Sequence, residues 1–475
     1  MSIYWTNNSC SPFTGLNGTC SLGNLAPYAL NISEAADVIS GIQFAQKNNI
    51  RLTIKNTGHD FLGRSTGASS LALWTHNLKE ITSLHYRSAA YSGPALRFGA
   101  GVQGGDLYRA ASARGLRVVG GSCPTVGVAG GFTQGGGHGP LGSAYGLGAD
   151  QVLEWEVVTA AGKHLTVSPT SDAELFWALS GGGAGNYGVV LSVTVRAHPD
   201  GPVAGAAFSF NNTSNETLYW EGVTTWLRYL TVLDSIDGLT TLTVITAQSL
   251  LLEFATWPDV TSADKIDNVL APFIDQLTQL NISTGTSYTS KIHPNFAQHY
   301  EYWATQIYDS NTTVGGRLIP RSVVKDEDVG LPALVTNLRD ITGSGAQVFL
   351  VAANFSHANH APNSVLPAWR DALIHMAFSN PLSVSSGWDE ILQDQAQLNI
   401  WQENMRTITP GGGTYMNEAT WDNPHWKNDY FGINYADLLA IKEKYDPTHV
   451  FWANAAVGSD TYWKVVQDGR LCRIE

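Results

Sequence analysis

The sequence predicts an α+β protein with more than one domain, and three observations support this. The chain has 475 residues, of which 43% are hydrophobic. Because this length is too great for a single core, we expect about two or three domains, each with its own core. Helix and strand patterns alternate from residue 34, but residues 151–167 predict an antiparallel hairpin, so the strands are mixed. Residues 201–410 contain fewer glycines and longer helical spacings, which indicates a second α+β domain.

The first domain has a clear series of elements. Residues 33–49 combine a capping-box start with helical spacing, and residues 104–115 form a helical pattern that ends at a C-cap glycine. Helices are therefore predicted at 33–49, 104–115 and 171–183. Strands are predicted at 50–56, 96–102 and 187–199, and the hairpin 151–167 turns at Ala161 and Gly162.

The rest of the chain gives a helix at 217–236 and strands at 239–248 and 346–356. Residues 410–432 are rich in aromatic side chains without a clear period, so we expect an irregular loop there. A helix follows at 434–447 and ends at Asp-Pro, because the residue before a proline disfavours helical backbone.

Composition limits the possible partners. No apolar run approaches the roughly 18 residues that a spanning helix needs, so we expect no membrane span. The net charge of -13 argues against a nucleic-acid partner, because binding a phosphate backbone needs a basic face. We expect a monomer that acts on small molecules.

Two features indicate secretion. Nine Asn-x-Ser/Thr sequons exceed chance expectation for this length, and they are candidate glycosylation sites. These are Asn7, Asn17, Asn31, Asn211, Asn212, Asn215, Asn281, Asn311 and Asn354. Cys10 and Cys20 bracket a small polar loop that an oxidising compartment would close with a disulfide. Residues 1–10 have neither a basic nor an apolar region, so we expect a mature form, and we expect Cys472 in the polar tail to be a free thiol.

Two glycine patterns could be mistaken for a Rossmann dinucleotide site. Gly99, Gly101 and Gly104 lie between a predicted strand and a predicted helix, but the acid that would bind a ribose about twenty residues later is absent. The second pattern, "GAGNYG" at 183–188, follows a helix and precedes a strand, which is the wrong order. We therefore do not expect a Rossmann NAD site.

Three glycine-rich clusters exceed what turns require: "KNTGHDFLGRS" at 55–65, "GGSCPTVGVAGGFTQGGGHG" at 120–139 and "GGGAGNYG" at 181–188. A missing Cβ lets backbone N–H groups approach a pyrophosphate or a flat ring, although turns and close packing would explain any one cluster. His59 and Cys123 each lie in one of them. A nucleophilic imidazole or thiolate beside a ring ligand is what a covalent attachment needs.

These motifs resemble the vanillyl-alcohol-oxidase type of flavoprotein oxidases and, within it, the berberine-bridge-enzyme-like group, which includes secreted fungal oligosaccharide oxidases. The resemblance covers residues 30–200 and 412–455, through "NTGHD", "GGSCPTVGVAGG", "GGGHGPLGSAYGLGADQVLEWEVVTAAG" and "YFGINYADLLAIKEKYDPTHVF". It implies a PCMH-type FAD-binding domain from residues 1–200 and 412–475. Residues 201–411 would then form a substrate domain with an antiparallel sheet flanked by helices.

The resemblance implies FAD held by two covalent bonds, from His59 to the flavin 8α-methyl and from Cys123 to flavin C6. It gives His138 a supporting role beside the cofactor. It also places further residues at the cofactor, namely Asn56, Thr57, Gly58, Ser65, Gly121, Ser122, Val126, Gly127, Gly130, Gly137, Gly146, Asp150, Gly188, Val190, Asn417 and Asn434.

Hydride transfer is easier when a base removes the neighbouring proton. Glu418 in "TYMNEA" resembles the catalytic glutamate of the plant "M-x-E" motif, with Tyr415 and Asn417 as contacts to flavin or substrate. Sugar oxidases of the group have a tyrosine there and a Gln-x-Asp pair where this chain reads "FLVAANFSHA", which weakens the expectation of oligosaccharide specificity. An exposed loop position remains the alternative for Glu418. We expect no metal site at His357 and His360, because no Asp, Glu or Cys flanks them.

The expected function is a secreted FAD-dependent oxidase that takes hydride from an alcohol or amine carbon of a small organic or carbohydrate substrate and reduces dioxygen to hydrogen peroxide. In the related plant enzymes a valine at the position of Val126 accompanies oxygen use and a leucine accompanies its exclusion, whereas Val126 could also be a plain packing residue. The alternatives are an oxygen-insensitive FAD dehydrogenase of the same fold and a secreted glycan-binding protein without catalysis. Absorbance near 450 nm would separate the last from the flavoproteins.

Overall fold

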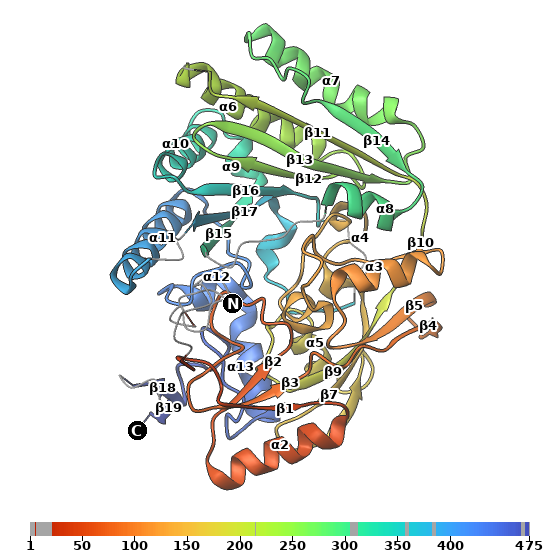
Figure 1. The fold of residues 1–475 in the computed structure, drawn as a ribbon, viewed down its shortest axis with the longest axis vertical. Coiled ribbons are helices and arrows are strands. Elements are labelled where there is room, and N and C mark those ends of the chain that lie inside the picture. Colours follow the sequence, from red (N-terminus) through yellow and green to blue (C-terminus); the bar gives the residue numbers. More distant parts are fainter. Residues whose placement is uncertain are drawn as a thin grey trace.

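The computed structural model describes residues 5, 21–213, 215–304, 312–356, 361–381, 386–466 and 471–474. Sheets of three, five and seven strands organise this part of the chain, and helices cover them (Figure 1). The predicted α+β class is confirmed. Cys10, Cys20, Asn7, Asn17, Asn311, His357 and His360 lie outside the described residues.

The three-stranded sheet is parallel. Its strands are β1 (Tyr28–Asn31), β3 (Leu71–Trp74) and β2 (Leu52–Lys55), in that order. Helix α2 (Ala35–Asn48) covers it with the buried side chains of Val38 and Ile42. The Asp37 carboxylate caps the helix start, accepting the backbone N–H and the hydroxyl of Ser33. The predicted helix 33–49 and strand 50–56 are confirmed.

The five-stranded sheet is antiparallel, in the order β4 (Ile81–Arg87), β5 (Ser92–Gly99), β9 (Val189–Arg196), β7 (Val152–Val158) and β8 (His164–Val167). The predicted hairpin is β7–β8, and Gly162 turns it with φ +71°. Helices α3 (Gly104–Ser112) and α5 (Ala173–Leu179) match the predictions. Helix α13 (Tyr435–Tyr445), from near the end of the chain, packs against α5 (Figure 1).

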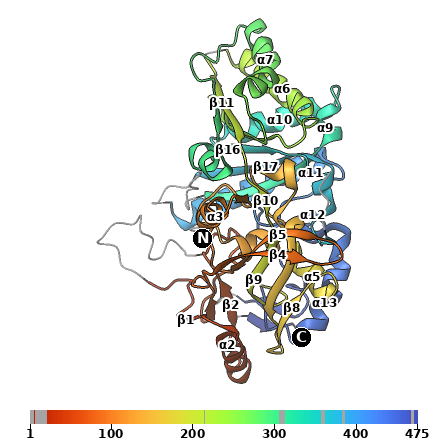
Figure 2. The same ribbon diagram turned by 90° about the vertical axis from the view of Figure 1, so that its right-hand side faces the viewer.

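The seven-stranded sheet is also antiparallel. Its order is β14 (Thr289–His293), β11 (Val203–Asn211), β13 (Ser249–Pro258), β12 (Thr240–Ile245), β16 (Gln347–Ala352), β17 (Ala372–Pro381) and β15 (Thr312–Pro320). One face packs on helices, which are α6 (Glu216–Leu233), α7 (Ala263–Gln279), α9 (Arg321–Lys325), α10 (Gly330–Gly343) and α11 (Trp388–Ile408). Figure 2 shows this layer of helices and sheet stacked above the smaller sheets.

Short elements complete the described chain. They are β6 (Leu116–Arg117), β10 (His198–Pro199), α4 (Gly142–Tyr145), α8 (Phe296–His299), α12 (Trp426–Phe431), β18 (Trp463–Val465), β19 (Leu471–Arg473) and the helical turns Val128–Phe132, Gly148–Gln151, Tyr300–Ala304, Pro367–Arg370 and Gly432–Asn434. One cluster of buried side chains joins Leu96 and Trp155, from the expected FAD-binding domain, to Val203 and Phe254, from the expected substrate domain. The expected domain boundaries therefore stay a prediction.

Helix α12 corrects the expected irregular loop at 410–432. Tyr430 and Phe431 are fully buried at the end of α12, and Gly432 ends the helix with φ +58°. Two turns of helix are too short to produce a clear hydrophobic period, so packing against the neighbouring core decides the conformation.

The described sequons differ in how available their amides are. Asn31, Asn211, Asn215 and Asn281 are exposed. The Asn354 side-chain N–H donates to the Asp234 carbonyl oxygen at 3.0 Å, and that of Asn212 donates to the Ala247 carbonyl oxygen, so a glycan on either would cost a hydrogen bond. Glycosylation and secretion stay predictions.

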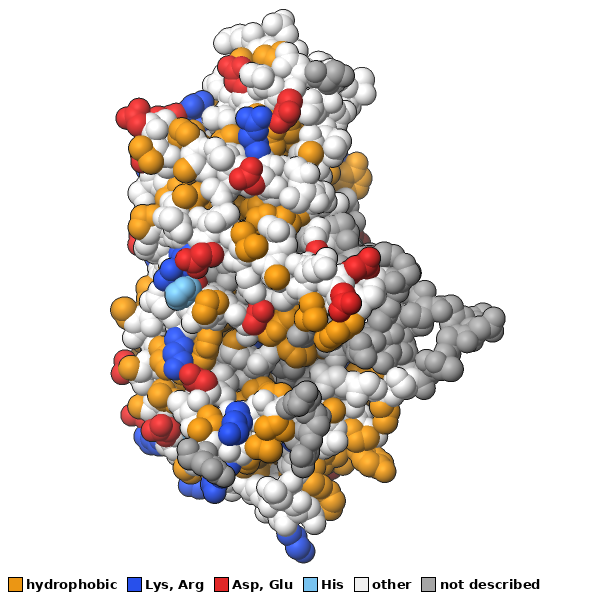
Figure 3. Space-filling view, turned by 90° about the vertical axis from the view of Figure 1, so that its left-hand side faces the viewer, with side chains coloured by type: hydrophobic (Ala, Val, Ile, Leu, Met, Phe, Trp, Pro, Cys, Tyr) orange, Lys and Arg blue, Asp and Glu red, His pale blue; other side chains and the backbone are white. Residues whose placement is uncertain are grey.

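The surface carries mixed charge. Figure 3 shows Lys and Arg side chains separated by acidic and apolar ones, without a continuous basic patch on this face. Within the described ranges, each helix falls short of the length and apolar character needed to cross a bilayer.

Acid should destabilise the fold partly through His299. This side chain is fully buried, its Nε2 lies 2.8 Å from the Thr256 hydroxyl, and burial lowers its pKa to about 3. Below pH 6.5 the unfolded chain gains a proton that the folded one refuses, so stability falls as pH falls. Urea titrations measure the free energy of unfolding at each pH. Between pH 7 and pH 4.5 this free energy should fall by about 3 kcal/mol less in His299→Gln than in wild type. His85→Gln, on an exposed histidine, should leave the loss unchanged; equal pH slopes for wild type and His299→Gln would contradict this account.

Candidate functional site

A cavity of about 700 Å³ lies between the glycine-rich loops and the seven-stranded sheet. All three glycine-rich clusters of the sequence contribute to its wall, and so does the segment 415–418. The opposite wall comes from β12, β13, β15, β16 and β17. The structure thus joins chain segments that are hundreds of residues apart around one space.

His59 and Cys123 converge on one hydroxyl. The His59 Nε2 lies 2.7 Å from Thr125 Oγ1, and the Cys123 Sγ lies 3.5 Å from the same oxygen. Cys123 is buried and is a free thiol, and both residues line the cavity. Two nucleophiles from separate loops therefore face the same end of the space.

Hydrogen bonds from α3 and its N-cap hold the Cys123 loop in place. Gln103 donates its side-chain amide to the Thr125 carbonyl oxygen at 2.8 Å, and the Gly104 N–H donates to the Val126 carbonyl oxygen at 3.0 Å. From the other side, the Tyr300 hydroxyl donates to the Ser122 carbonyl oxygen at 2.7 Å. These contacts fix the loop backbone, so the thiol has a defined position.

The Asp60 carboxylate organises the His59 loop. It accepts the backbone N–H groups of Leu62, Arg64 and Ser65 at 2.8 to 3.0 Å, together with the Ser65 hydroxyl at 2.6 Å. The Arg64 guanidinium lines the cavity and donates to the Asn454 carbonyl oxygen at 2.8 Å. A residue near the chain end therefore braces the loop.

The glycines separate into two groups. A Cβ on Gly101 would lie 1.9 Å from the His76 carbonyl oxygen, so this glycine serves close packing between loops. A Cβ on Gly127 or Gly130 would meet Asn56 at 2.7 or 3.0 Å, within the cavity wall. The buried Asn56 Oδ1 has no hydrogen-bond partner among the described residues. An unpaired buried acceptor beside bare backbone fits a flat ligand that donates a hydrogen bond.

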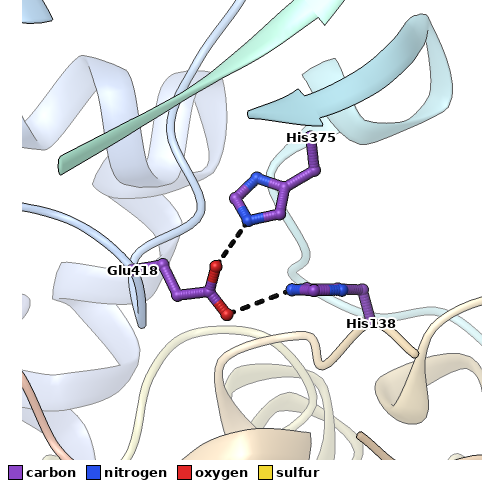
Figure 4. Close-up of side chains that lie close together, drawn as sticks. All are labelled: His138, His375 and Glu418. Carbon is purple, nitrogen blue, oxygen red and sulfur yellow. Dashed lines mark hydrogen bonds and ion pairs between the residues drawn. The ribbon is translucent and has the colours of Figure 1, made fainter. Parts of the chain in front are cut away.

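Glu418 and two histidines form a hydrogen-bonded cluster in the cavity (Figure 4). The His375 Nε2 lies 2.7 Å from one carboxylate oxygen of Glu418, and the His138 Nε2 lies 3.1 Å from the other. His375 is 1% exposed, His138 14% and Glu418 28%. The exposed-loop alternative for Glu418 is therefore wrong, because the carboxylate is part of the cavity wall.

The cluster keeps Glu418 ionised. Burial opposes ionisation, but the charges and hydrogen bonds of His138 and His375 outweigh it and hold the pKa of Glu418 well below its usual range. Burial also lowers the pKa of His375, against the attraction of the carboxylate. Tyr415 packs edge-on against both imidazoles, and burial raises the pKa of its phenol well above 10.

The same three side chains could in principle hold a metal ion, since their ligand atoms lie within 4.8 Å of one another. A metal-bound histidine usually donates its second ring nitrogen to a carboxylate or carbonyl. Here both Nδ1 atoms are buried without a hydrogen-bond partner in the described part of the chain. Two imidazoles that donate through Nε2 to one carboxylate account for the geometry better.

Contacts with β15 and α12 position Glu418. A Cβ on Gly316 would lie 2.8 Å from the Glu418 carbonyl oxygen, so this glycine lets the segment approach the sheet. The Thr414 N–H donates to the Asp429 carbonyl oxygen at 2.7 Å. The buried Arg317 guanidinium pairs with the Asp429 carboxylate at 3.1 Å and ties β15 to α12. The base is thus attached to the sheet that faces it.

Most residues predicted for the site line the cavity. These are Asn56, Thr57, Gly58, His59, Ser65, Gly121, Ser122, Cys123, Val126, Gly127, Gly130, His138, Gly188, Val190, Tyr415, Asn417 and Glu418. The Asn417 side-chain N–H donates to the Gly131 carbonyl oxygen and to the Tyr415 hydroxyl, both at 2.8 Å. This amide holds the Tyr415 segment against the glycine-rich loop.

Four predicted residues do not reach the cavity wall. The Asp150 carboxylate pairs with the Arg370 guanidinium at 2.7 Å, and the Asn434 side-chain N–H donates to the Ser364 carbonyl oxygen at 3.1 Å. Gly137 and Gly146 have positive φ values of +78° and +92°, which turn the chain. Their described contacts are structural, so they act on the site through the loops they hold.

His375 is a site residue that was not predicted from the sequence. It lies within the apolar strand "ALIHMAFS", where a single histidine among core residues gives a weak signal. Strand alternation could have found it, because His375, Ala377 and Ser379 share one face of β17 while Ile374, Met376 and Phe378 face the helices.

The chain is similar to known protein families and relatives. The family model for an FAD binding domain matches residues 27–168, and the model described as berberine and berberine like matches residues 414–458. FAD-linked oxidoreductase ZEB1 of Gibberella zeae is 40% identical over 482 residues, and FAD-linked oxidoreductase patO of Penicillium expansum is 42% identical over 482 residues. Each match covers 100% of this chain and 83% of the relative.

A solved structure agrees with the sequence relatives. The crystal structure of the VAO-type flavoprotein MtVAO615 from Myceliophthora thermophila C1 is 40% identical and matches with a TM-score of 0.94, covering 100% of this chain and 87% of that one. The matched FAD binding domain contains both His59 and Cys123, and the berberine-like match contains Glu418. The chain therefore belongs to the berberine-bridge-enzyme-like group of VAO-type flavoproteins and is an FAD-linked oxidoreductase.

Proposed function

We propose that this protein is an oxidase that converts an alcohol carbon, CH–OH, to a carbonyl and passes the two electrons to dioxygen, forming hydrogen peroxide. The observation that carries the proposal is the single cavity with His59 and Cys123 at one end and the His138–Glu418–His375 cluster in its wall. When bound, FAD accepts hydride from the substrate carbon and later reduces dioxygen.

The loops around His59 and Cys123 would hold the FAD. The convergence of both nucleophiles on Thr125 supports two covalent attachments, because each can reach the same ring system from a different loop. Gly127 and Gly130 leave the backbone bare there, and Asn56 Oδ1 offers an acceptor. These residues bind and orient the cofactor, which carries the redox chemistry.

Glu418 would accept the proton of the substrate hydroxyl. Its carboxylate is ionised and partly exposed to the cavity, and each oxygen keeps a free lone pair beside its histidine bond. His138 and His375 hold the carboxylate in one orientation, and the Tyr415 ring packs against both imidazoles. An orientated base beside the reacting carbon is what alcohol oxidation needs.

Val126 should decide between the oxidase and the oxygen-insensitive dehydrogenase. It lines the cavity in the same loop as Cys123, and an added methylene in Val126→Leu would fill a small apolar space that dioxygen needs. We expect flavin absorbance near 450 nm, rapid reoxidation of reduced wild type in air with one peroxide per flavin, and reoxidation at least about ten times slower in Val126→Leu. Anaerobic flavin reduction should be nearly unchanged.

Val232→Leu, on the exposed surface of α6, is the control and should reoxidise like wild type. Stopped-flow absorbance measures both half-reactions. Reduced wild-type flavin that persists in air but is oxidised quickly by a quinone dye would establish the dehydrogenase instead. A colourless protein would favour the glycan-binding alternative.

A further inference from the structure

The cavity face of the seven-stranded sheet has a pattern that bears on the substrate. Side chains alternate along each strand, so one face packs on the helices and the other lines the cavity. On β12, for example, Leu242 and Val244 line the cavity, while Ile245 is part of the core beneath the helices. The substrate side of the cavity is therefore set by the alternate residues of five adjacent strands.

Strand register arranges these side chains in rows across the sheet. The inner row pairs Leu242 with Val351 and Val351 with His375, which bonds Glu418. The outer row pairs Gln347 with Ser379, and Gln347 is exposed. Along the strands, the cavity face of the sheet therefore runs from the inner row, which contacts the Glu418 base, to the outer row, whose polar side chains lie near solvent.

The members of the middle row that line the cavity are all apolar. Leu251 pairs with Val244, Val244 with Phe349 and Phe349 with Ala377, so four adjacent strands contribute one hydrocarbon surface. Three strand spacings make this surface about 14 Å wide. Glu253, in the bulge of β13, adds a carboxylate at its edge.

This surface discriminates between substrate classes. A sugar placed on it would lose the water bound to several hydroxyls and find no hydrogen-bond partner in the middle row. A hydrocarbon body would instead gain by leaving water against Val244 and Phe349. Among the described side chains of the inner and outer rows, polar groups lie at the two ends of such a molecule, at the Glu418 cluster and at Gln347 and Ser379. Glu253 adds one carboxylate beside the middle row.

We propose that the substrate is a hydrophobic alcohol, an aryl or alicyclic carbinol, and not a polyhydroxylated sugar. Its body lies on the middle row, and its CH–OH group lies at Glu418. This rests on the proposed function: the alcohol loses a hydride and a proton and becomes the ketone, while dioxygen gains both electrons and two protons as hydrogen peroxide. The cavity chemistry selects the hydrocarbon body independently of that redox step.

Binding tests the substrate class without requiring turnover. We expect 2-acetonaphthone, the ketone of a naphthyl carbinol, to bind the holoenzyme in calorimetric titrations, and cellobiose to bind at least 100-fold more weakly. We also expect 1-(2-naphthyl)ethanol to reduce the flavin anaerobically faster than cellobiose. If 2-acetonaphthone binds but neither 1-(2-naphthyl)ethanol nor cellobiose reduces the flavin, the substrate class is supported and the proposed function is contradicted.

Variants locate the binding surface. Val244→Asp puts a charge in the middle row and should weaken 2-acetonaphthone binding at least tenfold, and the near-isosteric Val244→Thr should weaken it about threefold if the aspartate variant fails to fold. Val329→Asp, at a 68% exposed position, should bind like wild type. Cellobiose binding tighter than the ketone, or unchanged ketone binding in the folded Val244 variants, would overturn the proposal.

Discussion

Glu418→Gln should slow flavin reduction by about 10² to 10⁴-fold. The amide keeps the shape of the side chain but cannot accept the proton of the substrate hydroxyl. The Gln amide oxygen can still accept from one of the two histidines that hold Glu418 at 2.7 and 3.1 Å, and its NH2 can donate to the other once that imidazole takes its Nδ1–H tautomer. Substrate affinity should therefore change little. Single-turnover stopped-flow absorbance separates the reduction rate from binding.

The control is Glu221→Gln, an exposed carboxylate on α6, which should reduce at the wild-type rate. An unchanged reduction rate in Glu418→Gln would remove Glu418 from the chemistry and leave it a structural acceptor for His138 and His375.

The pH profile tests how the base is held. Because His138 and His375 lower the pKa of Glu418, the wild-type base should stay ionised at pH values where a free glutamate takes up a proton, about 4.3. His375→Asn removes one hydrogen bond to the charged form, so the pKa of Glu418 should rise and the acid loss of flavin reduction should move to higher pH. If the flavin reduction rate of His375→Asn falls at the same low pH as that of wild type, His375 has a packing role only.

The His59→Ala, Cys123→Ala double variant should release all of its flavin on acid precipitation, whereas wild type and each single variant should retain it with the protein. The prediction rests on the positions of the two nucleophiles, 2.7 and 3.5 Å from one Thr125 hydroxyl but on separate loops. One bond is enough to keep the flavin attached, so only loss of both frees it.

Cys472→Ala removes the other described free thiol, far along the chain, and should leave the flavin attached. Absorbance of the supernatant at 450 nm measures release, and mass spectrometry of flavin peptides identifies the attachment sites. Free flavin from denatured wild type, or complete release from one single variant, would contradict the two-bond arrangement.

The sequence alone determined the local features. Gly-rich runs, the hairpin turn at Gly162 and the helix start at residue 34 all depend on neighbours within a few residues, so their patterns are readable without a fold. The clusters around His59 and Cys123 were also recognisable, because bare backbone next to a nucleophile is unusual whatever surrounds it. The short helix α12 was not, because its burial depends on a distant core.

Only the tertiary structure decided the chemistry of the base and the substrate surface. Glu418 bonds a histidine 280 residues away and another 43 residues away, and no local pattern encodes which distant imidazoles meet a carboxylate. His375 looks like a core residue until the register of β16 and β17 places it beside Val351 on the cavity face. A shift of one residue would turn that histidine toward the helices, so strand register, set by packing on both faces of the sheet, determines the site.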